Sequence, residues 1–335
     1  MSAETGTGRG EFAATLHDML TAACVPDAAR RWAAGDRVPG LAVWRRLADL
    51  GVTALAVPEK WGGLGASPAD LAAACAELGH HALPGPVAES IAAVPALLAA
   101  LDDPDQRGEW LAGLCSGDLI ATLAVPPRMP FAADAEAAGL VLLASADVIQ
   151  LARAGTRHRS VDPARSLSGT VALDVLARGA GAAVARAFDL GTLACSAQLI
   201  GAGRALLEAS VRHARERTQF GRPIGAQAAV KHRLADAAIG LEFARPLLDG
   251  AAAAIAVNAA TVPRDVSAAK VACADAAYRA ARAALQVHGA IGYTAEHDLS
   301  LWLTKVRALV ATWGSQAEHR DRIMAELARG GNSWT

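Results

Sequence analysis

Apolar side chains recur at helical spacing in the first and last parts of the chain. Leu41, Trp44 and Leu47 fall on one face of a helical pattern, and Gly51 follows at the position where helices commonly end. Towards the C-terminus, small and apolar residues from Ala269 to Val287 form a comparable stripe. This periodicity predicts helices in both parts of the chain.

Proline and glycine mark the expected ends of these helices. The segment VPEKWGGLGASPADL (57–71) predicts a loop, followed by a helix with Ser67 as its N-cap and Pro68 as its first residue. Pro246 lies inside a second helical stripe, where it predicts a kink or the end of a helix. The segment NAATVPRD (258–265) predicts a loop between two long helices.

The middle of the chain changes to short apolar stretches separated by charged or proline-containing turns. This spacing is typical of strands, which we expect within 139–145, 147–152 and 169–175. The predicted fold class is therefore mainly α with a small β insert. The predicted domains are an N-terminal helical domain (1–116), a reduced β domain (117–186) and a C-terminal domain (187–330) long enough for a four-helix bundle.

Composition and charge narrow the class of function. Lys and Arg total 32 and Asp and Glu total 33, so the chain lacks the basic surplus that nucleic acid or an anionic membrane requires. The longest clean apolar run, Ile91 to Leu101, is shorter than the roughly 20 residues that span a bilayer. No secretory signal is visible. We therefore expect a cytoplasmic protein that binds neither nucleic acid nor membrane.

Common catalytic and metal-binding motifs are missing from the sequence. It holds no P-loop and no G-x-S-x-G nucleophile elbow, and Gly201-Ala202-Gly203 lies within a helical pattern rather than after a strand. Five scattered cysteines form no C-x-x-C pair, and nine histidines form no H-E-x-x-H. His80 and His81 fall at a predicted helix end, where we interpret them as capping or solvent-exposed residues. We predict no metal site.

Three longer segments carry a resemblance to a known family. They are RERTQFGRPIGAQAAVKHRLADAA (215–238), QVHGAIGYTAEHDLSLW (286–302) and GVTALAVPEKWGGLGASPADL (51–71). At this separation, and in the order of helical, β and helical domains, the chain closely resembles the acyl-CoA dehydrogenase family from about Leu41 to Ile323. The resemblance implies that family's fold and its cofactor, FAD.

In this family an extended FAD lies at a dimer interface and is held mainly by the neighbouring subunit. The resemblance implies contacts to the adenosine and pyrophosphate of that flavin from Arg217 and Phe220 of the R-x-x-F-G segment, and from Gln286 and Gly289 of the Q-x-x-G segment. Gln227 matches a further glutamine of the family. An arginine suits this role because it neutralises a pyrophosphate through charge-assisted hydrogen bonds.

The family's catalytic glutamate has no counterpart in this sequence. The family uses one of two positions for the base that removes the α-proton of an acyl thioester. Counting along the motifs places Trp313 at one position and Gly191 at the other, so we predict no catalytic residue in this chain. Asp189 is a candidate displaced base, but a shift of two residues turns a helical side chain by about 200°.

The β domain departs from the family as well. Nothing between Gly117 and Arg186 resembles the T-E-P-like turn and the W-I-T-like strand that contact the flavin ring in catalytic members. The combination resembles the smaller subunit of heteromeric α2β2 acyl-CoA dehydrogenases that degrade steroids in actinobacteria. It implies a larger catalytic partner subunit, an FAD site completed across the interface, and a bulky acyl-CoA substrate such as a steroid-derived thioester.

Two other functions stay open on the sequence. A non-catalytic paralogue would bind acyl-CoA or a partner protein as a scaffold or regulator, and it would leave the flavin content of a partner unchanged. A flavin oxygenase of the same fold would not need the glutamate, although it would still need its flavin ring held. A homomer with an unusual base is a further alternative that keeps the dehydrogenase function.

Overall fold

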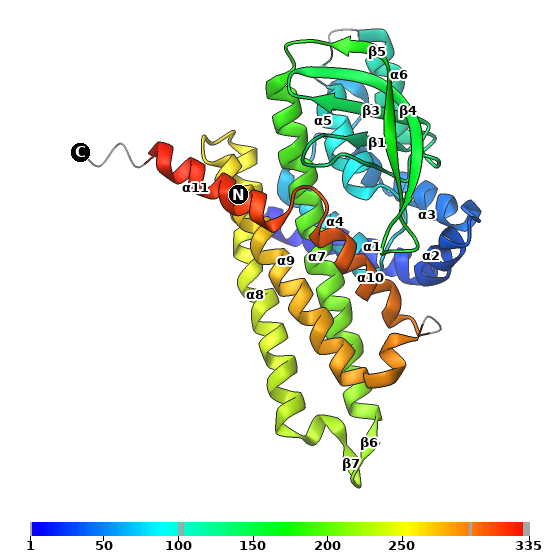
Figure 1. Ribbon diagram of the computed structural model, residues 1–335, viewed down its shortest axis with the longest axis vertical. Coiled ribbons are helices and arrows are strands. Elements are labelled where there is room, and N and C mark those ends of the chain that lie inside the picture. The colour runs from blue at the N-terminus through cyan, green and yellow to red at the C-terminus, as the bar shows by residue number, and fades with distance from the viewer. Residues whose placement is uncertain (1, 100, 102–103, 295–296, 331–335) are drawn as a thin grey trace.

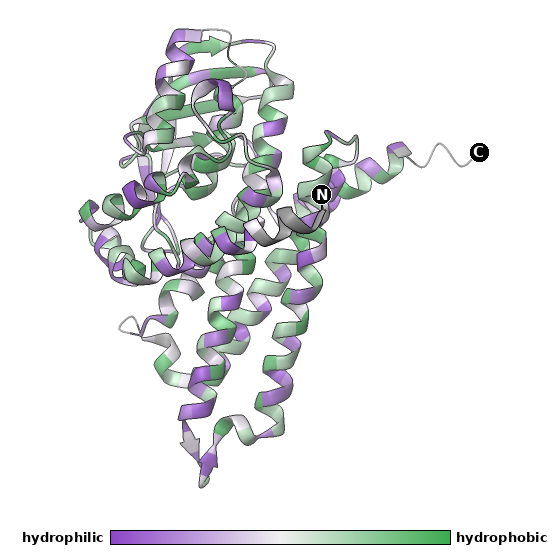
Figure 2. Ribbon diagram, turned by 180° about the vertical axis from the view of Figure 1, so that it is seen from behind, coloured by the Kyte–Doolittle hydropathy of each residue, from purple (hydrophilic) through white to green (hydrophobic). Residues whose placement is uncertain are grey.

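The computed structural model describes residues 2–99, 101, 104–294 and 297–330. Short N-terminal helices and a small sheet lie together at one end, and long C-terminal helices extend away from them (Figure 1). Hydrophobic and hydrophilic residues alternate around these long helices, as their amphipathic packing requires (Figure 2). The predicted mainly α fold with a small β insert is confirmed.

The N-terminal helices begin and end where local sequence signals place them. Gly51 follows a helix with a left-handed φ of 76°, and the Ser67 hydroxyl accepts a hydrogen bond of 3.2 Å from the Asp70 amide to cap the helix that begins at Pro68. These predictions are confirmed. The helices and short turns are α1 (Ser2–Ala22), α2 (Val25–Ala33), α3 (Val38–Asp49), η1 (Val52–Ala54), η2 (Glu59–Trp61), α4 (Pro68–His80), η3 (Glu89–Ala93), α5 (Val94–Leu98) and α6 (Pro104–Ser116).

A five-stranded sheet in the order β1-β3-β4-β5-β2 follows these helices. The first pair, β1 with β3, is parallel, and the other pairs are antiparallel. The strands are β1 (Ala121–Ala124), β2 (Ala132–Ala133), β3 (Leu140–Ser145), β4 (Val148–Arg159) and β5 (Ser166–Ala177). The three predicted strands correspond to β3, β4 and β5, and β4 and β5 run further than predicted.

The C-terminal part is a bundle of long helices with a small hairpin at its far end (Figure 1). Its elements are α7 (Gly181–Glu216), β6 (Thr218–Gln219), β7 (Arg222–Pro223), η4 (Ile224–Ala226), α8 (Ala228–Ala256), α9 (Val262–His288), η5 (Gly289–Tyr293), α10 (Leu299–Val310) and α11 (Gln316–Gly330). Residues 295–296 of the segment 286–302 lie outside the described residues. The predicted end of a helix at Pro246 is wrong, because α8 continues through it. A proline removes only one backbone donor, and the packing of α8 along α9 maintains the helix.

The helix α7 is the centre of the molecule and packs against α4, α8, α9 and α10. A side-chain carbon at Gly201 would lie within 2.7 Å of the backbone of Ala76 and His80, so this glycine permits the close crossing of α4 over α7. Its role is helix packing and not nucleotide binding, as the sequence pattern predicts. By length and composition α7 is apolar enough to cross a membrane, but 89% of its apolar window is buried within the protein.

Candidate functional site

The two positions that the sequence analysis aligned with the family's base meet in space. Trp313, in the turn after α10, is fully buried, and its indole ring lies on the backbone of α7 at Gly191. A side-chain carbon at position 191 would lie 2.6 Å from Cζ2 of Trp313 and closer still to two other ring atoms. A carboxylate at position 191 and this indole therefore exclude each other.

Aromatic and imidazole rings hold Trp313 in place. The ring of Phe188 lies 5.9 Å from it between centroids, and His319 Nε2 donates a hydrogen bond of 2.7 Å to the Trp313 carbonyl. Burial lowers the pKa of His319 to about 4, so this imidazole is neutral near pH 7. Trp313 also has a left-handed φ of 59°, uncommon for a bulky residue, and Gly314 follows at 88°. The surroundings therefore determine one position for the indole.

Asp189, the candidate displaced base, belongs to the buried part of α7. Its carboxylate forms an ion pair of 2.7 Å with Arg322 Nη1 of α11. Burial raises the pKa of Asp189, and the neighbouring Arg322 opposes that rise. Because α7 is already helical here, Asp189 and Gly191 point to nearly opposite sides of the helix. The structure thus joins Asp189 to α11 instead of to the space beside Gly191.

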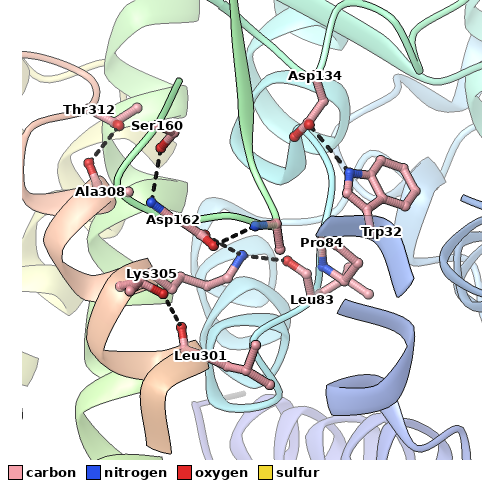
Figure 3. A network of polar contacts seen from close by, with 12 residues as sticks. Trp32, Leu83, Pro84, Asp134, Ser160, Asp162, Leu301, Lys305, Ala308 and Thr312 are labelled. Carbon is pink, nitrogen blue, oxygen red and sulfur yellow. Dashed lines mark hydrogen bonds and ion pairs between the residues drawn. The ribbon is translucent and has the colours of Figure 1, made fainter. Parts of the chain in front are cut away.

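A buried ion pair near Trp313 joins the loop between β4 and β5 to α10. Asp162, in the loop between β4 and β5, lies 3.6 Å from Lys305 Nζ, and both side chains are less than a tenth exposed. Lys305 also donates a hydrogen bond of 2.8 Å to the Leu83 carbonyl (Figure 3). The backbone amide of Ala164 donates to Asp162 Oδ1 at 2.9 Å. These contacts fill the region where sheet, N-terminal domain and α10 converge.

A cavity of about 220 Å³ between the sheet and α10 lies near this ion pair and is lined in part by Val161 and Ala308. A second cavity directly beside the pair is much smaller. The cavity bordered by Asp162, Lys305 and Trp313 has a volume of about 20 Å³, which is room for a single water molecule. Glu89 of η3 is also buried at this cavity, and burial raises the pKa of its carboxyl group. Sequence reasoning missed Glu89, Asp162 and Lys305, because no local pattern distinguishes them from ordinary surface charges.

The far end of the bundle presents a contrasting, open arrangement. Arg217 directly follows α7 in extended backbone and is exposed, and its carbonyl accepts a hydrogen bond of 2.8 Å from the Ile224 amide across the hairpin. Phe220, at the hairpin tip, is 92% exposed and has a left-handed φ of 53°. An aromatic ring that is both exposed and held by unusual backbone geometry suggests contact with another molecule.

Three of the five predicted cofactor contacts line one groove of about 330 Å³. Phe220, Gln227 and Gln286 all border it, although they come from the hairpin, the start of α8 and the end of α9. Arg217 and Gly289 are not among its lining residues. Gly289 ends α9 with a φ of 63°, and a side-chain carbon added there would meet no other atom within 4 Å, so backbone conformation explains its glycine.

Arg233 is a lining residue of this groove that sequence reasoning missed. It lies in α8 and is exposed, as are Arg217 and Arg222. Within residues 2–99, 101, 104–294 and 297–330, none of these three guanidinium groups has a carboxylate within ion-pair distance. A local surplus of positive charge beside an aromatic ring and two amides suits a planar base attached to a phosphate group.

An apolar surface on α8 and α9 extends from this end of the bundle. Phe243, Ile239 and Leu247 of α8 are 77%, 53% and 45% exposed. They border a shallow groove of about 1000 Å³ between the two helices, to which α9 contributes Arg279 and Arg282. Exposed apolar side chains gathered on one face, with arginines at its edge, are typical of a protein–protein interface.

Comparison with known proteins agrees with this geometry. Residues 9–118 match the acyl-CoA dehydrogenase N-terminal domain, and residues 177–328 match the acyl-CoA dehydrogenase C-terminal domain. The chain is 32% identical over 320 residues to acyl-CoA dehydrogenase IpdE2 of Mycobacterium tuberculosis, covering 93% of this chain and 95% of that relative.

Solved structures share the whole fold. The ChsE4-ChsE5 complex from Mycobacterium tuberculosis superposes with a TM-score of 0.83 and 25% identity over 96% of this chain and 97% of that one. The Tcur3481-Tcur3483 steroid ACAD G363A variant superposes with a TM-score of 0.84 and 23% identity over 98% and 99% of the two chains. With matches to both family domains and a relative aligned over nearly its full length, the chain belongs to the acyl-CoA dehydrogenase family.

Proposed function

We propose that this chain is a non-dehydrogenating subunit of a heteromeric, FAD-dependent acyl-CoA dehydrogenase. It completes the flavin site of a larger catalytic subunit and supplies no catalytic base of its own. The observation that carries this proposal is the contact between Trp313 and Gly191, because one indole ring occupies the space at both family base positions. The α,β-desaturation of the acyl-CoA then takes place in the partner's site.

We assign the adenosine and pyrophosphate end of the cofactor to this chain. The exposed Arg217 and the groove formed by Phe220, Gln227 and Gln286 suit these groups, and Gly289 has open space beside its backbone. The three-ring isoalloxazine does not fit the 20 Å³ cavity beside the Asp162–Lys305 ion pair. FAD supplies hydride acceptance when bound, and in this proposal the reactive ring lies in the partner subunit.

A partner subunit is supported by the apolar face of α8 and α9. Phe243 and its neighbours on that face are exposed in the isolated chain. Their removal from water contributes roughly 25 cal/mol per Å² before the entropy cost of association is subtracted. The similarity to the ChsE4-ChsE5 complex also favours a heteromer, and we propose an α2β2 heterotetramer. By analogy with the steroid ACAD of the same fold, we propose a bulky, steroid-derived acyl-CoA as substrate. We also propose a cytoplasmic location, because the apolar part of α7 is 89% buried within the protein.

The Arg217→Ala variant tests whether the hairpin end of this chain contributes to FAD binding in the complex. Co-expressed with a larger, catalytic acyl-CoA dehydrogenase subunit from the same genome, it should form a complex of normal mass that binds FAD about 10- to 100-fold more weakly, since a charge-assisted hydrogen bond contributes about 1.5–3 kcal/mol. Arg153→Ala is the matched control, because Arg153 is an exposed arginine on β4, in the sheet at the opposite end of the molecule. Flavin content and native mass are the readouts.

The same experiment separates the alternatives. Equal flavin content in wild-type and Arg217→Ala complexes contradicts the assignment of Arg217. A partner whose flavin content does not depend on this chain at all indicates the scaffold or regulatory function. The oxygenase alternative requires a flavin ring held in this chain, so a chain that binds no flavin on its own disfavours it.

A further inference from the structure

Three histidines and a glutamate converge where the first helix packs on α4. His17 comes from α1, Glu77 and His80 from α4, and His81 from the end of that helix, and one nitrogen or oxygen atom of each lies within 4.8 Å of the others. His17 Nδ1 is 3.0 Å from Glu77 Oε2 and 3.3 Å from His81 Nε2. Ligand atoms around tetrahedral zinc lie at similar separations, about 3.3–3.4 Å, because each is about 2.0–2.1 Å from the ion.

Sequence spacing explains how one helix supplies three of these groups. Glu77 is separated from His80 by three positions and from His81 by four, which places them on the same helix face. The expectation that His80 and His81 are capping or solvent-exposed is wrong in its second part, since their exposed fractions are 9% and 8%. The missing information was non-local: α1 covers this face and adds His17.

Two residues of α7 contact members of this cluster. Both terminal nitrogens of Arg204 lie 3.1 Å from Glu77 Oε1, which leaves Oε2 directed at His17. Glu208 Oε2 lies 3.0 Å from His80 Nε2, while His80 Nδ1 is buried without a hydrogen-bond partner among the described residues. A carboxylate on the far nitrogen of a histidine, and a hydrogen bond on the far oxygen of a carboxylate, are the supports that metal ligands usually have.

We propose that His17, Glu77, His80 and His81 form a binding site for a divalent transition-metal ion of the zinc class. Arg204 and Glu208 are positioning residues that orient Glu77 and His80. Three imidazole nitrogens and one carboxylate oxygen are a ligand set that suits Zn²⁺, which accepts four-coordinate tetrahedral geometry.

The surroundings permit entry of an ion from solvent. The His17 side chain is 39% exposed, and His80 and His81 also border a cavity of about 450 Å³. A bound ion would connect α1 to α4, in addition to the Arg9–Asp70 ion pair of 2.8 Å between the same helices. The site is therefore a structural cross-link of the N-terminal domain, separate from the flavin half-site at the far end of α7.

The test uses the full chain without a polyhistidine tag, stripped with a chelator and titrated with ZnCl₂. Wild type should bind one Zn²⁺ per chain in competition with a chromophoric chelator, and Co²⁺ should give the visible absorption of a tetrahedral site. His17→Ala and His81→Ala should each weaken binding at least about 100-fold. Glu208→Gln, at a half-exposed residue that leaves the fold intact, should weaken it about 10- to 100-fold.

His232→Ala is the matched control, because His232 is exposed on α8 away from the cluster. It should bind Zn²⁺ as wild type does, and far-ultraviolet circular dichroism verifies that each variant is folded. Failure of wild type to take up one equivalent of Zn²⁺ overturns the proposal. Zn²⁺ uptake equal to that of wild type in Glu208→Gln, together with equal uptake in a folded His17→Ala or His81→Ala variant, also overturns the proposal. The result is independent of flavin content, which the Arg217 variant measures.

Discussion

The two ends of α7 differ in how tightly the surrounding side chains are packed and in how far they are exposed. At the sheet end, Trp313 covers Gly191 and the Asp162–Lys305 ion pair is buried nearby. At the hairpin end, the side chains of Phe220 and Arg217 are exposed. A region that must hold substrate needs volume, and a region that completes a partner's site needs exposed, oriented groups. In the proposed function, the hairpin end is a region of the second kind, and Trp313 occupies the place of the first.

The largest effect on stability is expected from removing the Trp313 indole, which fills the space beside Gly191. Trp313→Ala should lower the free energy of unfolding by about 3–5 kcal/mol, because it leaves a large cavity in place of a fully buried ring. Gly191→Ala should cost about 1–3 kcal/mol through overlap with the indole. Urea denaturation measures both.

Combining these substitutions shows whether their effects arise from one contact. In the Trp313→Ala background, Gly191→Ala should cost less by about 0.5–3 kcal/mol, since the ring it collides with is gone. Leu327→Ala, at a residue 48% exposed on α11, is the control and should change stability by less than about 0.5 kcal/mol. Strict additivity of the two substitutions would mean that the indole does not occupy the space at Gly191.

The buried ion pair between the β4–β5 loop and α10 gives the next effect. Asp162→Asn leaves the Lys305 ammonium buried and unpaired, so we expect a loss of about 3–5 kcal/mol in the free energy of unfolding. Glu242→Gln disrupts the exposed pair with Arg245, 3.9 Å apart, and should cost less than about 1 kcal/mol. Equal costs for the two variants would show that Asp162 and Lys305 are solvated and that the region is open.

Stability should fall in acid because of the histidine beside Trp313. Burial, with help from Lys270 and Arg322, lowers the pKa of His319 to about 4, whereas an unfolded histidine titrates near 6.5. The unfolded chain thus binds more protons in this window, so stability is complete above pH 6.5 and is lost as pH falls towards 4. His319 should account for a loss of about 2 kcal/mol by pH 5.

The His319→Gln variant isolates this contribution. Between pH 7 and pH 5 its free energy of unfolding should fall less steeply than that of wild type, while His81, whose pKa is also lowered to about 4, retains its own share. Substitution of the exposed His232 by glutamine should leave the slope unchanged. Parallel pH profiles for His319→Gln and wild type would indicate that His319 is accessible to protons in the folded protein.

The smallest effect is expected at Asp189. Asp189→Asn should leave turnover of the heteromeric complex within about twofold, because this carboxylate is paired with Arg322 and does not face a substrate. Steady-state kinetics of the complex, at equal flavin content, measures this. A loss on the order of 10²-fold or more, the scale of a general base, would place the base in this chain.

Local signals predicted the elements well, and non-local contacts explain the failures. Ser67, Pro68 and Gly51 act on their immediate neighbours, so their effects on helix ends could be predicted directly. Of the two outcomes predicted at Pro246, a kink or the end of a helix, the helix end does not occur, because packing along α9 maintains α8 through this residue. The burial of His80 required knowledge of which helix covers it.

In the candidate site, too, motifs predicted single residues but not the contacts between them. Gly191 and Trp313 could be aligned to the family positions one at a time, but their contact depends on α7 and the turn after α10 meeting in the fold. Phe220, Gln227 and Gln286 were found from motifs, and the fold brings them to one groove. Arg233 has no distinguishing spacing, and only the packing of α8 beside the hairpin places it there.

The most direct test of the central claim is the flavin stoichiometry of the purified complex. This chain is expressed alone and then with a larger, catalytic acyl-CoA dehydrogenase subunit from the same genome, and native mass and flavin absorbance are measured in both cases. We predict that the chain alone is colourless and that the co-expressed complex is a yellow heterotetramer with one FAD for each pair of unlike subunits. A yellow homomer that carries one FAD per chain and oxidises acyl-CoA unaided would contradict this prediction.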